Sequence, residues 1–233
     1  MSSRNCLAIL LDAPMQSWGD SSRFQYRNTI SHPTKSGLIG LIAAAMGIDK
    51  YAEDENVRIE ELCRLSMTII FLPKQKKIKK KLEQERLDDY HTVMGTKAAD
   101  GSSLKNSVIT HRQYLLDARF GVFFEGDSEL LSSVALAIQN PRWGIWFGRK
   151  CCIPASPLYV DLSTNKQDAW SSLLSRLNLN VDSPIEDFMR IEESTAFTDR
   201  SDFIADLPIS FSAPQLHTSR CICKFYPVTL KKV

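Results

Sequence analysis

The chain has 233 residues, of which 43% are hydrophobic and 24% are charged, with 10 glycines and 10 prolines. This composition excludes collagen-like, low-complexity and disordered classes, because a chain this apolar buries enough surface to offset the entropy lost on ordering. The net charge is only +2, but residues 161–206 hold 10 acidic and 4 basic side chains, so the rest of the chain is basic. We expect a polyanion to bind that basic part.

The sequence carries no signal for a membrane, for export or for a metal. Its longest apolar run, residues 38–46, is far shorter than the about 20 residues that cross a bilayer. The first residues lack the small-residue cleavage site of a secretory signal. The six cysteines include no C-x-x-C spacing that would begin a zinc site. We expect a cytoplasmic protein with reduced thiols and with no membrane association, metal or cofactor.

The first elements in chain order are a strand and a helix. Residues 6–11 form a short apolar run that ends at a proline turn, which predicts a buried strand. Thr34 can cap the free amides of the helix that follows it, and Gly47 can end that helix in the left-handed conformation. Residues 62–72 predict a second strand, stopped by Pro73.

Residues 74–107 differ from the segments on either side. They are charged, contain few large apolar side chains, and begin with six lysines within residues 74–81. This composition predicts an excursion from the core, in which residues 88–93 form a polar loop. We expect much of the excursion to be mobile in the free protein and to order when it binds a partner.

The core resumes after the excursion. Residues 108–116 and 118–125 predict strands, apolar residues between 130 and 138 recur at helical spacing, and residues 143–147 predict a fourth strand. The order strand, helix, strand, excursion, strand, helix, strand is that of the ferredoxin-like α+β fold. RNA-binding RRM domains use this fold and stack bases on the face of the sheet.

The last third of the chain gives weaker signals. We expect a helix near residues 167–177, irregular acidic segments after it, and a closing strand at residues 220–230. No internal repeat occurs at a fixed period.

Basic residues gather where the predicted loops converge, around the start of the first helix and after the fourth strand. A helix N-terminus with free amides binds anions, and arginine grips a phosphate with two parallel hydrogen bonds. The alternative is a set of solvated surface charges. The phosphate-binding rim would consist of Arg23, Arg27, Lys35, Ser36, Arg149 and Lys150.

The start of the first helix also resembles the end of a P-loop, in which a lysine followed by a serine or threonine begins a helix. Lys35 and Ser36 would begin the helix here. The P-loop pattern requires glycines that let its backbone wrap phosphates. Thr34 and Thr29 stand at those positions. The sequence therefore disfavours an NTPase.

The excursion adds a second group of candidates. The lysine run, which includes Lys76 and Lys77, suits the backbone of a nucleic acid, although such runs are as often solvated surface. Tyr90 and His91 place an aromatic ring and an imidazole in polar surroundings.

The strand after the excursion adds a third group. Arg112 and Tyr114 share one face with Thr110, and His111 points to the other side. An arginine beside a tyrosine is typical of phosphate binding and base stacking. A lone histidine is more often structural than catalytic, because acid-base chemistry also needs a positioned partner.

Five blocks of this sequence are together specific for one family. They are residues 11–19 (LDAPMQSWG), 33–41 (PTKSGLIGL) and 89–93 (DYHTV), Arg112 with Tyr114, and residues 148–150 (GRK). In this order and spacing they resemble the CasD family, the crRNA-handle-binding subunit of the type I-E CRISPR Cascade complex. The resemblance extends over roughly residues 5–160.

The resemblance implies a fold and a role. The fold is an RRM-like domain of the RAMP superfamily at residues 1–150, with a projecting thumb at about residues 74–109 and a small C-terminal β-rich region at residues 151–233. The role is that of a non-catalytic RNA-binding subunit of a ribonucleoprotein complex in antiviral defence. Such a subunit binds the 5′ handle of crRNA, caps the backbone filament of CasC subunits, docks the large subunit CasA and contacts target DNA within the complex.

The alternative function is a metal-independent endoribonuclease that processes precursor crRNA. In that reaction His91 or His111 deprotonates a 2′-hydroxyl, and Tyr90 and Lys35 assist. No Ser-His-Asp or Cys-His arrangement is recognisable, so we favour the non-catalytic subunit and assign no catalytic residue. The expected RNA-binding residues are Gln16, Trp18, Arg23, Arg27, Lys35, Ser36, Lys76, Lys77, Tyr90, His91, Arg112, Tyr114, Arg149 and Lys150.

Overall fold

The structure is a computed structural model, and it describes residues 5–19, 25–72, 84–98, 100–103, 107–199, 201–212 and 215–227. Three of the expected RNA-binding residues, Arg23, Lys76 and Lys77, lie outside the described residues, together with the rest of the lysine run. Within the described part, no helix is both long and apolar enough to cross a membrane.

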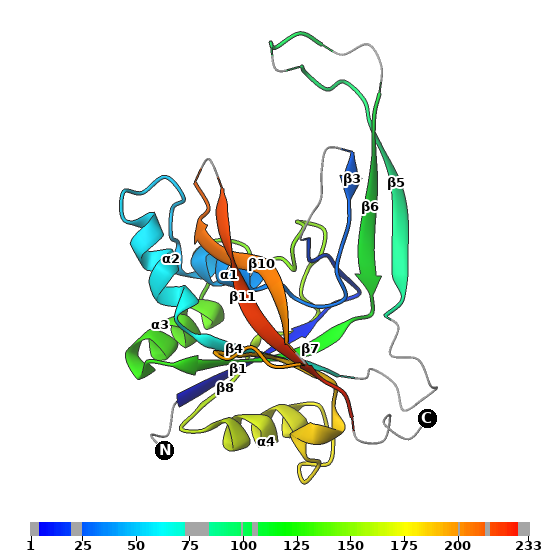
Figure 1. The fold of residues 1–233 in the computed structure, drawn as a ribbon. Coiled ribbons are helices and arrows are strands. Elements are labelled where there is room, and N and C mark those ends of the chain that lie inside the picture. Colours follow the sequence, from blue (N-terminus) through cyan, green and yellow to red (C-terminus); the bar gives the residue numbers. More distant parts are fainter. Residues whose placement is uncertain are drawn as a thin grey trace.

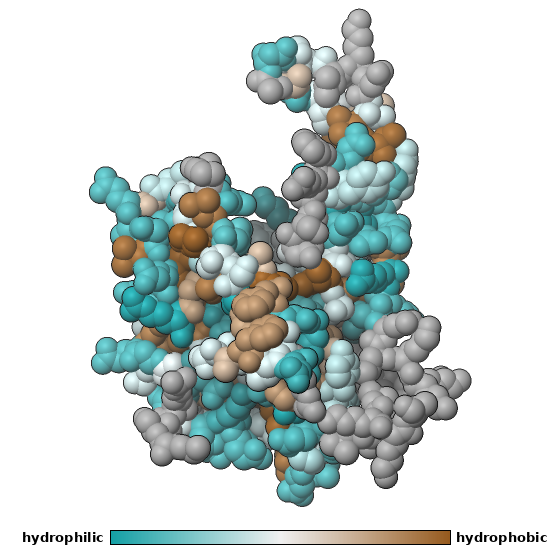
Figure 2. All heavy atoms as spheres, in the orientation of Figure 1, coloured by the Kyte–Doolittle hydropathy of each residue, from teal (hydrophilic) through white to brown (hydrophobic). Residues whose placement is uncertain are grey.

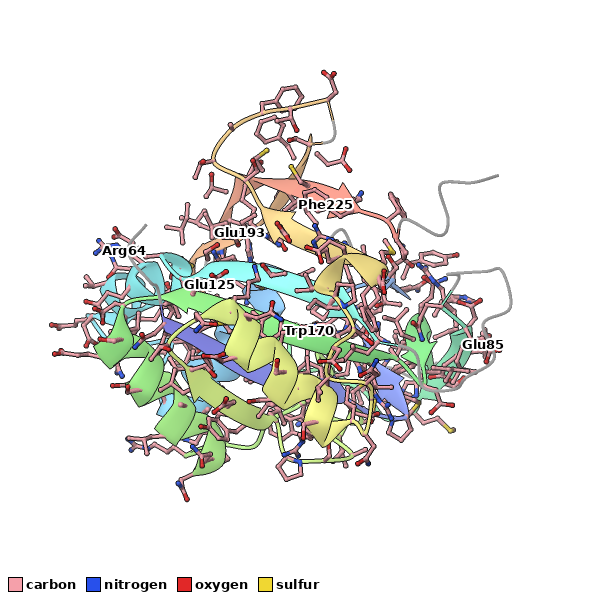
Figure 3. The ribbon with its side chains drawn as sticks, turned by 90° about the horizontal axis from the view of Figure 1, so that it is seen from below. Arg64, Glu85, Glu125, Trp170, Glu193 and Phe225 are labelled. Atoms are coloured by element: carbon pink, nitrogen blue, oxygen red, sulfur yellow. The ribbon has the colours of Figure 1, made fainter. Side chains whose placement is uncertain are left out.

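The body of the molecule is a mixed α+β structure built on an antiparallel sheet of seven described strands, with helices on both faces (Figure 1). Helices α1 (Lys35–Met46), α2 (Glu55–Cys63) and α3 (Ser128–Gln139) pack on one face, and α4 (Lys166–Arg176) packs on the other (Figure 3). In spatial order the strands are β10 (Ser201–Ser210), β11 (Leu216–Phe225), β9 (Arg190–Glu193), β4 (Ser66–Phe71), β7 (Arg119–Gly126), β1 (Asn5–Asp12) and β8 (Tyr159–Ser163).

Strand β1 is buried on both faces, which explains its continuous apolar sequence. Alternate side chains of a strand point to opposite faces. Those of Leu7, Ile9 and Leu11 enter the core under α1, α2 and α3, and the intervening ones pack with Trp170 and Leu173 of α4. The predicted first strand is therefore confirmed, but this part of the sheet offers no open face of the kind on which RRM domains stack bases.

Helix α1 begins and ends where the sequence predicts. Thr34 Oγ1 accepts a hydrogen bond from the amide three residues on, at 3.1 Å, and Gly47 has a φ of 69°. The strand expected at residues 62–72 is shorter than predicted, because α2 occupies residues 55–63 and β4 begins only at Ser66. The sequence analysis missed α2, whose buried side chains recur at helical spacing.

The predicted fourth strand at residues 143–147 is wrong. The backbone amides of Arg142 and Trp143 donate to carbonyl groups of α1 rather than to a neighbouring strand. Of the five residues only Phe147 is buried. The apolar side chains here belong to a loop that covers the end of α1, and the strand beside β1 is β8.

A second sheet carries a hairpin that stands out from the body (Figure 1). Strands β5 (Arg86–Val93) and β6 (Val108–Leu116) pair antiparallel, and β6 also pairs with β2 (Met15–Gln16) and β3 (Tyr26–Arg27). The polar loop predicted at residues 88–93 is wrong, since these residues belong to β5. Pairing with β6 makes them a strand, and a sequence without apolar alternation does not reveal that pairing.

The C-terminal part adds strands to the seven-stranded sheet. The helix predicted near residues 167–177 is confirmed as α4, and a 3₁₀ turn, η1 (Ile185–Asp187), follows it. The acidic segment expected to be irregular contains β9 and β10 instead, and β9 pairs with β4. Strand β11 begins at Leu216, before the closing strand predicted at residues 220–230. The sheet thus runs across the boundary expected at residue 150.

Candidate nucleic-acid interface

The register of the hairpin divides its side chains between two faces. Tyr90 lies opposite His111 and Asp89 lies opposite Arg112, while Tyr26 of β3 is paired with His111. Residues that are directly opposite each other in a ladder project to the same side. One side, the aromatic face, carries Tyr26, Tyr90 and His111. The other side, the cationic face, carries Arg27, Arg112, Tyr114, Asp89 and His91. Arg149, from the loop after α3, lies over the Tyr114 ring on this face.

The aromatic face presents three rings to solvent. The Tyr26 ring stacks on His111 with centroids 5.0 Å apart and an interplanar angle of 11°, and Tyr90 meets His111 edge-on at 5.3 Å. Tyr26 and Tyr90 are 60% and 61% exposed. Sequence reasoning missed Tyr26, although an aromatic residue directly before Arg27 in a polar stretch was a usable signal. Exposed rings of this kind can stack with bases.

The cationic face joins three arginines from separate segments. The guanidinium of Arg149 lies 4.5 Å from the centre of the Tyr114 ring, and it donates to the carbonyl oxygens of Gln113 at 3.0 Å and Arg27 at 2.6 Å. Arg112 donates from Nε to Thr110 Oγ1 at 3.2 Å. These bonds use only some of the N–H groups that each guanidinium carries. The predicted sharing of one face by Arg112, Tyr114 and Thr110 is confirmed.

Gly148 explains how the loop after α3 brings Arg149 onto β6. Its φ is 94°, a conformation that side chains disfavour, and an added Cβ would lie 1.7 Å from the carbonyl oxygen of Ser17. The amide of Ser17 also donates to the carbonyl of Phe147 at 3.0 Å. The exposed Lys150 follows, with its ammonium 5.8 Å from the centre of the Trp146 ring. Only glycine allows this close passage of two backbones.

Lys35 does not reach this surface. Its Nζ donates to the carbonyls of Cys63 and Leu65, each at 2.9 Å, and forms an ion pair with Glu193 at 2.8 Å. Its side chain is 3% exposed, and its amide donates to Asp206 Oδ2 at 2.7 Å. The anion site expected at the start of α1 is thus occupied by a carboxylate of the chain itself. Neighbouring Ser36 bonds to the capping Thr34.

Gln16 and Trp18 are also internal. The Trp18 indole donates to Gln16 Oε1 at 3.0 Å, and Gln16 Nε2 donates to the carbonyl of Ala118 at 2.8 Å. Trp18 packs against Phe147 with centroids 6.1 Å apart, and both side chains of the Gln16–Trp18 pair are buried. These residues position the segment between β2 and α1 rather than offering a surface to RNA.

The two histidines of the alternative nuclease site point to opposite faces of the hairpin. His91 lies on the cationic face with its Nδ1 4.0 Å from Asp89 Oδ2, whereas His111 lies on the aromatic face. Lys35, the proposed assisting cation, is held by Glu193. Among the described residues no cluster of histidine, cysteine and carboxylate side chains is arranged to hold a metal ion, and all six cysteines are free thiols.

Comparison with known proteins covers almost the whole chain. The family model described as CRISPR-associated protein (Cas_Cas5) matches residues 6–222. The CRISPR system Cascade subunit CasD of Escherichia coli (strain K12) is 28% identical over 220 residues, which cover 90% of this chain and 93% of that protein.

Solved structures agree with the sequence comparison. A chain of a CRISPR RNA-guided surveillance complex matches with a TM-score of 0.69 and 26% identity, covering 97% of this chain and 92% of that chain. A chain described as a crystal structure of Cas protein matches with a TM-score of 0.60 and 25% identity, covering 94% and 93%. The similarity therefore includes both the seven-stranded sheet and the hairpin.

Proposed function

This chain belongs to the CRISPR-associated Cas_Cas5 family, and from that membership we propose that it binds the 5′ handle of crRNA as a non-catalytic subunit of a surveillance complex. Its similarity to CasD relates it to a Cascade subunit. The proposal further assigns it the capping of a filament of CasC subunits, the docking of CasA and contact with target DNA, in a cytoplasmic complex of antiviral defence.

The observation that carries RNA binding is the convergence of Arg27, Arg112 and Arg149 on one face of the hairpin sheet. Arg149 rests on carbonyl oxygens and on the Tyr114 ring, so no carboxylate neutralises it in the contacts described. Asp89 is the one described acidic residue in register with this face, and its carboxylate lies near His91. Guanidinium groups with spare N–H donors suit phosphate oxygens.

We propose a ferredoxin-like (RRM-like) assignment for the strands β8, β1, β7 and β4. Their antiparallel order, with helical connections between β1 and β4 and between β7 and β8, supports it. Since α4 covers the sheet face that an RRM leaves open, the proposal places RNA on the projecting hairpin instead. The hairpin would then be the core of the thumb.

Direct binding tests this proposal. Fluorescence anisotropy with RNA that carries the repeat-derived handle, and with RNA that lacks it, should give tighter binding to the handle RNA. The variant Arg149→Ala should lose that preference. The control variant Arg64→Ala, at an exposed residue directly after α2, should keep it. Equal affinity of the wild-type chain for both RNAs would contradict the proposal.

The position of Lys35 supports a non-catalytic role. The alternative needs a cation on the phosphate beside its base, either His91 or His111, and Lys35 is buried and paired with Glu193. Incubating the protein with repeat RNA in EDTA decides between the two functions. A specific cut that disappears in His91→Ala or His111→Ala would establish the endoribonuclease alternative.

A further inference from the structure

Trp146, in the loop after α3, is an exposed aromatic residue near the cationic face. It is 37% exposed, and the ammonium of Lys150 lies 5.8 Å from the centre of its ring. Between these two residues the chain passes through Arg149, whose guanidinium lies over the Tyr114 ring and donates to the carbonyl oxygen of Gln113 on β6. The Trp146 ring is therefore close in the chain to the arginine that we assign to phosphate binding.

The loop holds the Trp146 ring in place. The amide of Phe147 donates to the carbonyl of Cys152 at 2.9 Å, and the amide of Cys152 donates to the carbonyl of Arg149 at 2.8 Å. Both Phe147 and Cys152 are fully buried. A Cβ added to Gly144 would lie 2.8 Å from two atoms of the six-membered ring of Trp146, so the ring rests against the backbone there. A ring that is positioned before its ligand arrives loses little entropy on binding.

The charged groups around the ring are cations. Within the described residues neither Arg149 nor Lys150 forms an ion pair: Arg149 contacts carbonyl oxygens and the Tyr114 ring, and Lys150 lies over the Trp146 ring. Hydrophilic residues cover most of the visible side of the hairpin where β5 and β6 leave the body (Figure 2). A protein interface would instead present an apolar core. A flat ring beside cations that lack carboxylate partners suits an unpaired RNA base and its flanking phosphates.

We propose that the ring of Trp146 stacks with one unpaired base of the handle RNA, while Arg149 and Lys150 bind the phosphates on either side of that nucleotide. Lys150 then moves from the ring to a phosphate, which frees the ring face that its ammonium covers. Such stacking tolerates any base, because every base has a π face. The inference rests on the proposed binding of handle RNA, and it adds a site for one base to the phosphate contact made by Arg149.

Tryptophan fluorescence tests the stacking directly. Two of the four tryptophans, at positions 18 and 170, are buried, whereas Trp143 and Trp146 are 43% and 37% exposed. Saturating handle RNA should quench the emission of the wild-type chain, and Trp146→Phe should lose most of that quenching. The matched control is Trp143→Phe, in the same loop but bonded through its amide to the end of α1, and it should keep the quenching. Equal quenching of Trp146→Phe and the wild type would overturn the proposal.

RNA that lacks single bases extends the test to affinity. Removing the base at one position of the handle should weaken binding of the wild-type chain by about five- to hundredfold, the range for one stacked base. Trp146→Leu should bind intact handle RNA as weakly as that, and the same abasic position should weaken the variant by no more than about twofold further. Trp146→Phe keeps an aromatic ring and should recover part of the affinity. Independent, additive losses at every position would overturn the proposal.

The wild-type chain alone keeps the test decisive if the variants are unstable. The abasic RNA that binds most weakly should also quench least at saturation, and no quenching by intact handle RNA would overturn the proposal. Loss of a protein subunit from a reconstituted complex by Trp146→Leu, with unchanged affinity for RNA, would overturn it in favour of a protein contact.

A failure of the proposed RNA-binding role would show differently. In that case the wild-type chain would bind RNA with and without the handle equally well. If the wild-type chain prefers handle RNA and the variants of Trp146 do so equally, with the same quenching, only the stacking proposal fails.

Discussion

Two groups of cations in this molecule have opposite surroundings. In the buried cluster, Lys35 and Arg220 face Glu193 and Asp206, with Arg220 bound to both oxygens of Asp206 at 2.6 and 2.9 Å. On the cationic face, the contacts of Arg149 are carbonyl oxygens and a tyrosine ring. The first group is neutralised within the fold, and the second keeps its positive charge available. What neutralises a cation, rather than its type, indicates whether it can bind RNA.

Removing Arg220 should give the largest effect. Asp206 is 2% exposed, and Arg220→Ala would leave its carboxylate buried without its bidentate partner. A free energy of unfolding lower by about 3–5 kcal/mol is expected. Chemical denaturation measures this free energy of unfolding. The control is Arg64→Ala, which removes an exposed ion pair with Glu60, and for it we expect a change below about 1 kcal/mol. Equal changes in the two variants would show that the buried cluster is not a structural unit.

Removing Arg149 should affect RNA binding more than folding. Arg149→Ala deletes a charged group that lies across β3 and β6, and we expect the affinity for handle RNA to fall about ten- to hundredfold. Arg149→Lys keeps the charge but loses the fork of N–H donors, so it should recover only part of the affinity. Full recovery by lysine would show that the geometry of the guanidinium is irrelevant.

The pH dependence of stability should report on the buried imidazole of His32. Burial lowers the pKa of His32 from its ordinary value of 6.5, with smaller opposing influences from the Pro33 carbonyl and Asp206. The unfolded chain therefore binds a proton below about pH 6.5 that the folded chain resists. The contribution of neutral His32 to the free energy of unfolding is complete above pH 6.5. It is lost as the pH falls from 6.5 toward the lower pKa of the folded state, by up to about 1.4 kcal/mol per pH unit.

The variant His32→Asn isolates that contribution. Its free energy of unfolding should fall less steeply between pH 6.5 and 5 than that of the wild-type chain, while the affinity for RNA at pH 7 should stay the same. Identical slopes for the two proteins would contradict the assignment to His32.

Removing Arg112 should give the smallest effect. Arg112→Ala should weaken handle binding a few-fold and reduce the slope of log affinity against log salt by about 0.7, the value for one phosphate contact on a single strand. Titrations at several salt concentrations measure the slope. An unchanged slope would remove Arg112 from the interface.

The sequence predicts those parts of the fold whose signals are local. The continuous apolar run of β1, the cap at Thr34 and the left-handed Gly47 all depend on near neighbours in the chain. Strand β5 depends on its pairing with β6. The segment at 143–147 is a loop, in which the amide of Trp143 donates to Ala44 of α1 and the amide of Phe147 donates to Cys152. Such long-range partners leave no periodic pattern in the sequence.

The residues of the candidate site divide in the same way, between those that a local pattern predicts and those that depend on distant contacts. Alternation along β6 is enough to place Arg112 and Tyr114 on one face. The burial of Lys35 depends on Glu193 and Asp206, which come from distant strands of the sheet, so its role was misassigned. Tyr26 joins the site only through its pairing with His111.

The most direct measurement is cross-linking of handle RNA to the protein in the assembled complex, with the modified residues identified by mass spectrometry. We expect cross-links on the two faces of the hairpin sheet, at the exposed Tyr26 and Tyr90 or in the segment around Arg149. Handle cross-links confined to α4 or to the start of α1 would contradict it, because they would place the RNA on the body of the molecule and not on the hairpin.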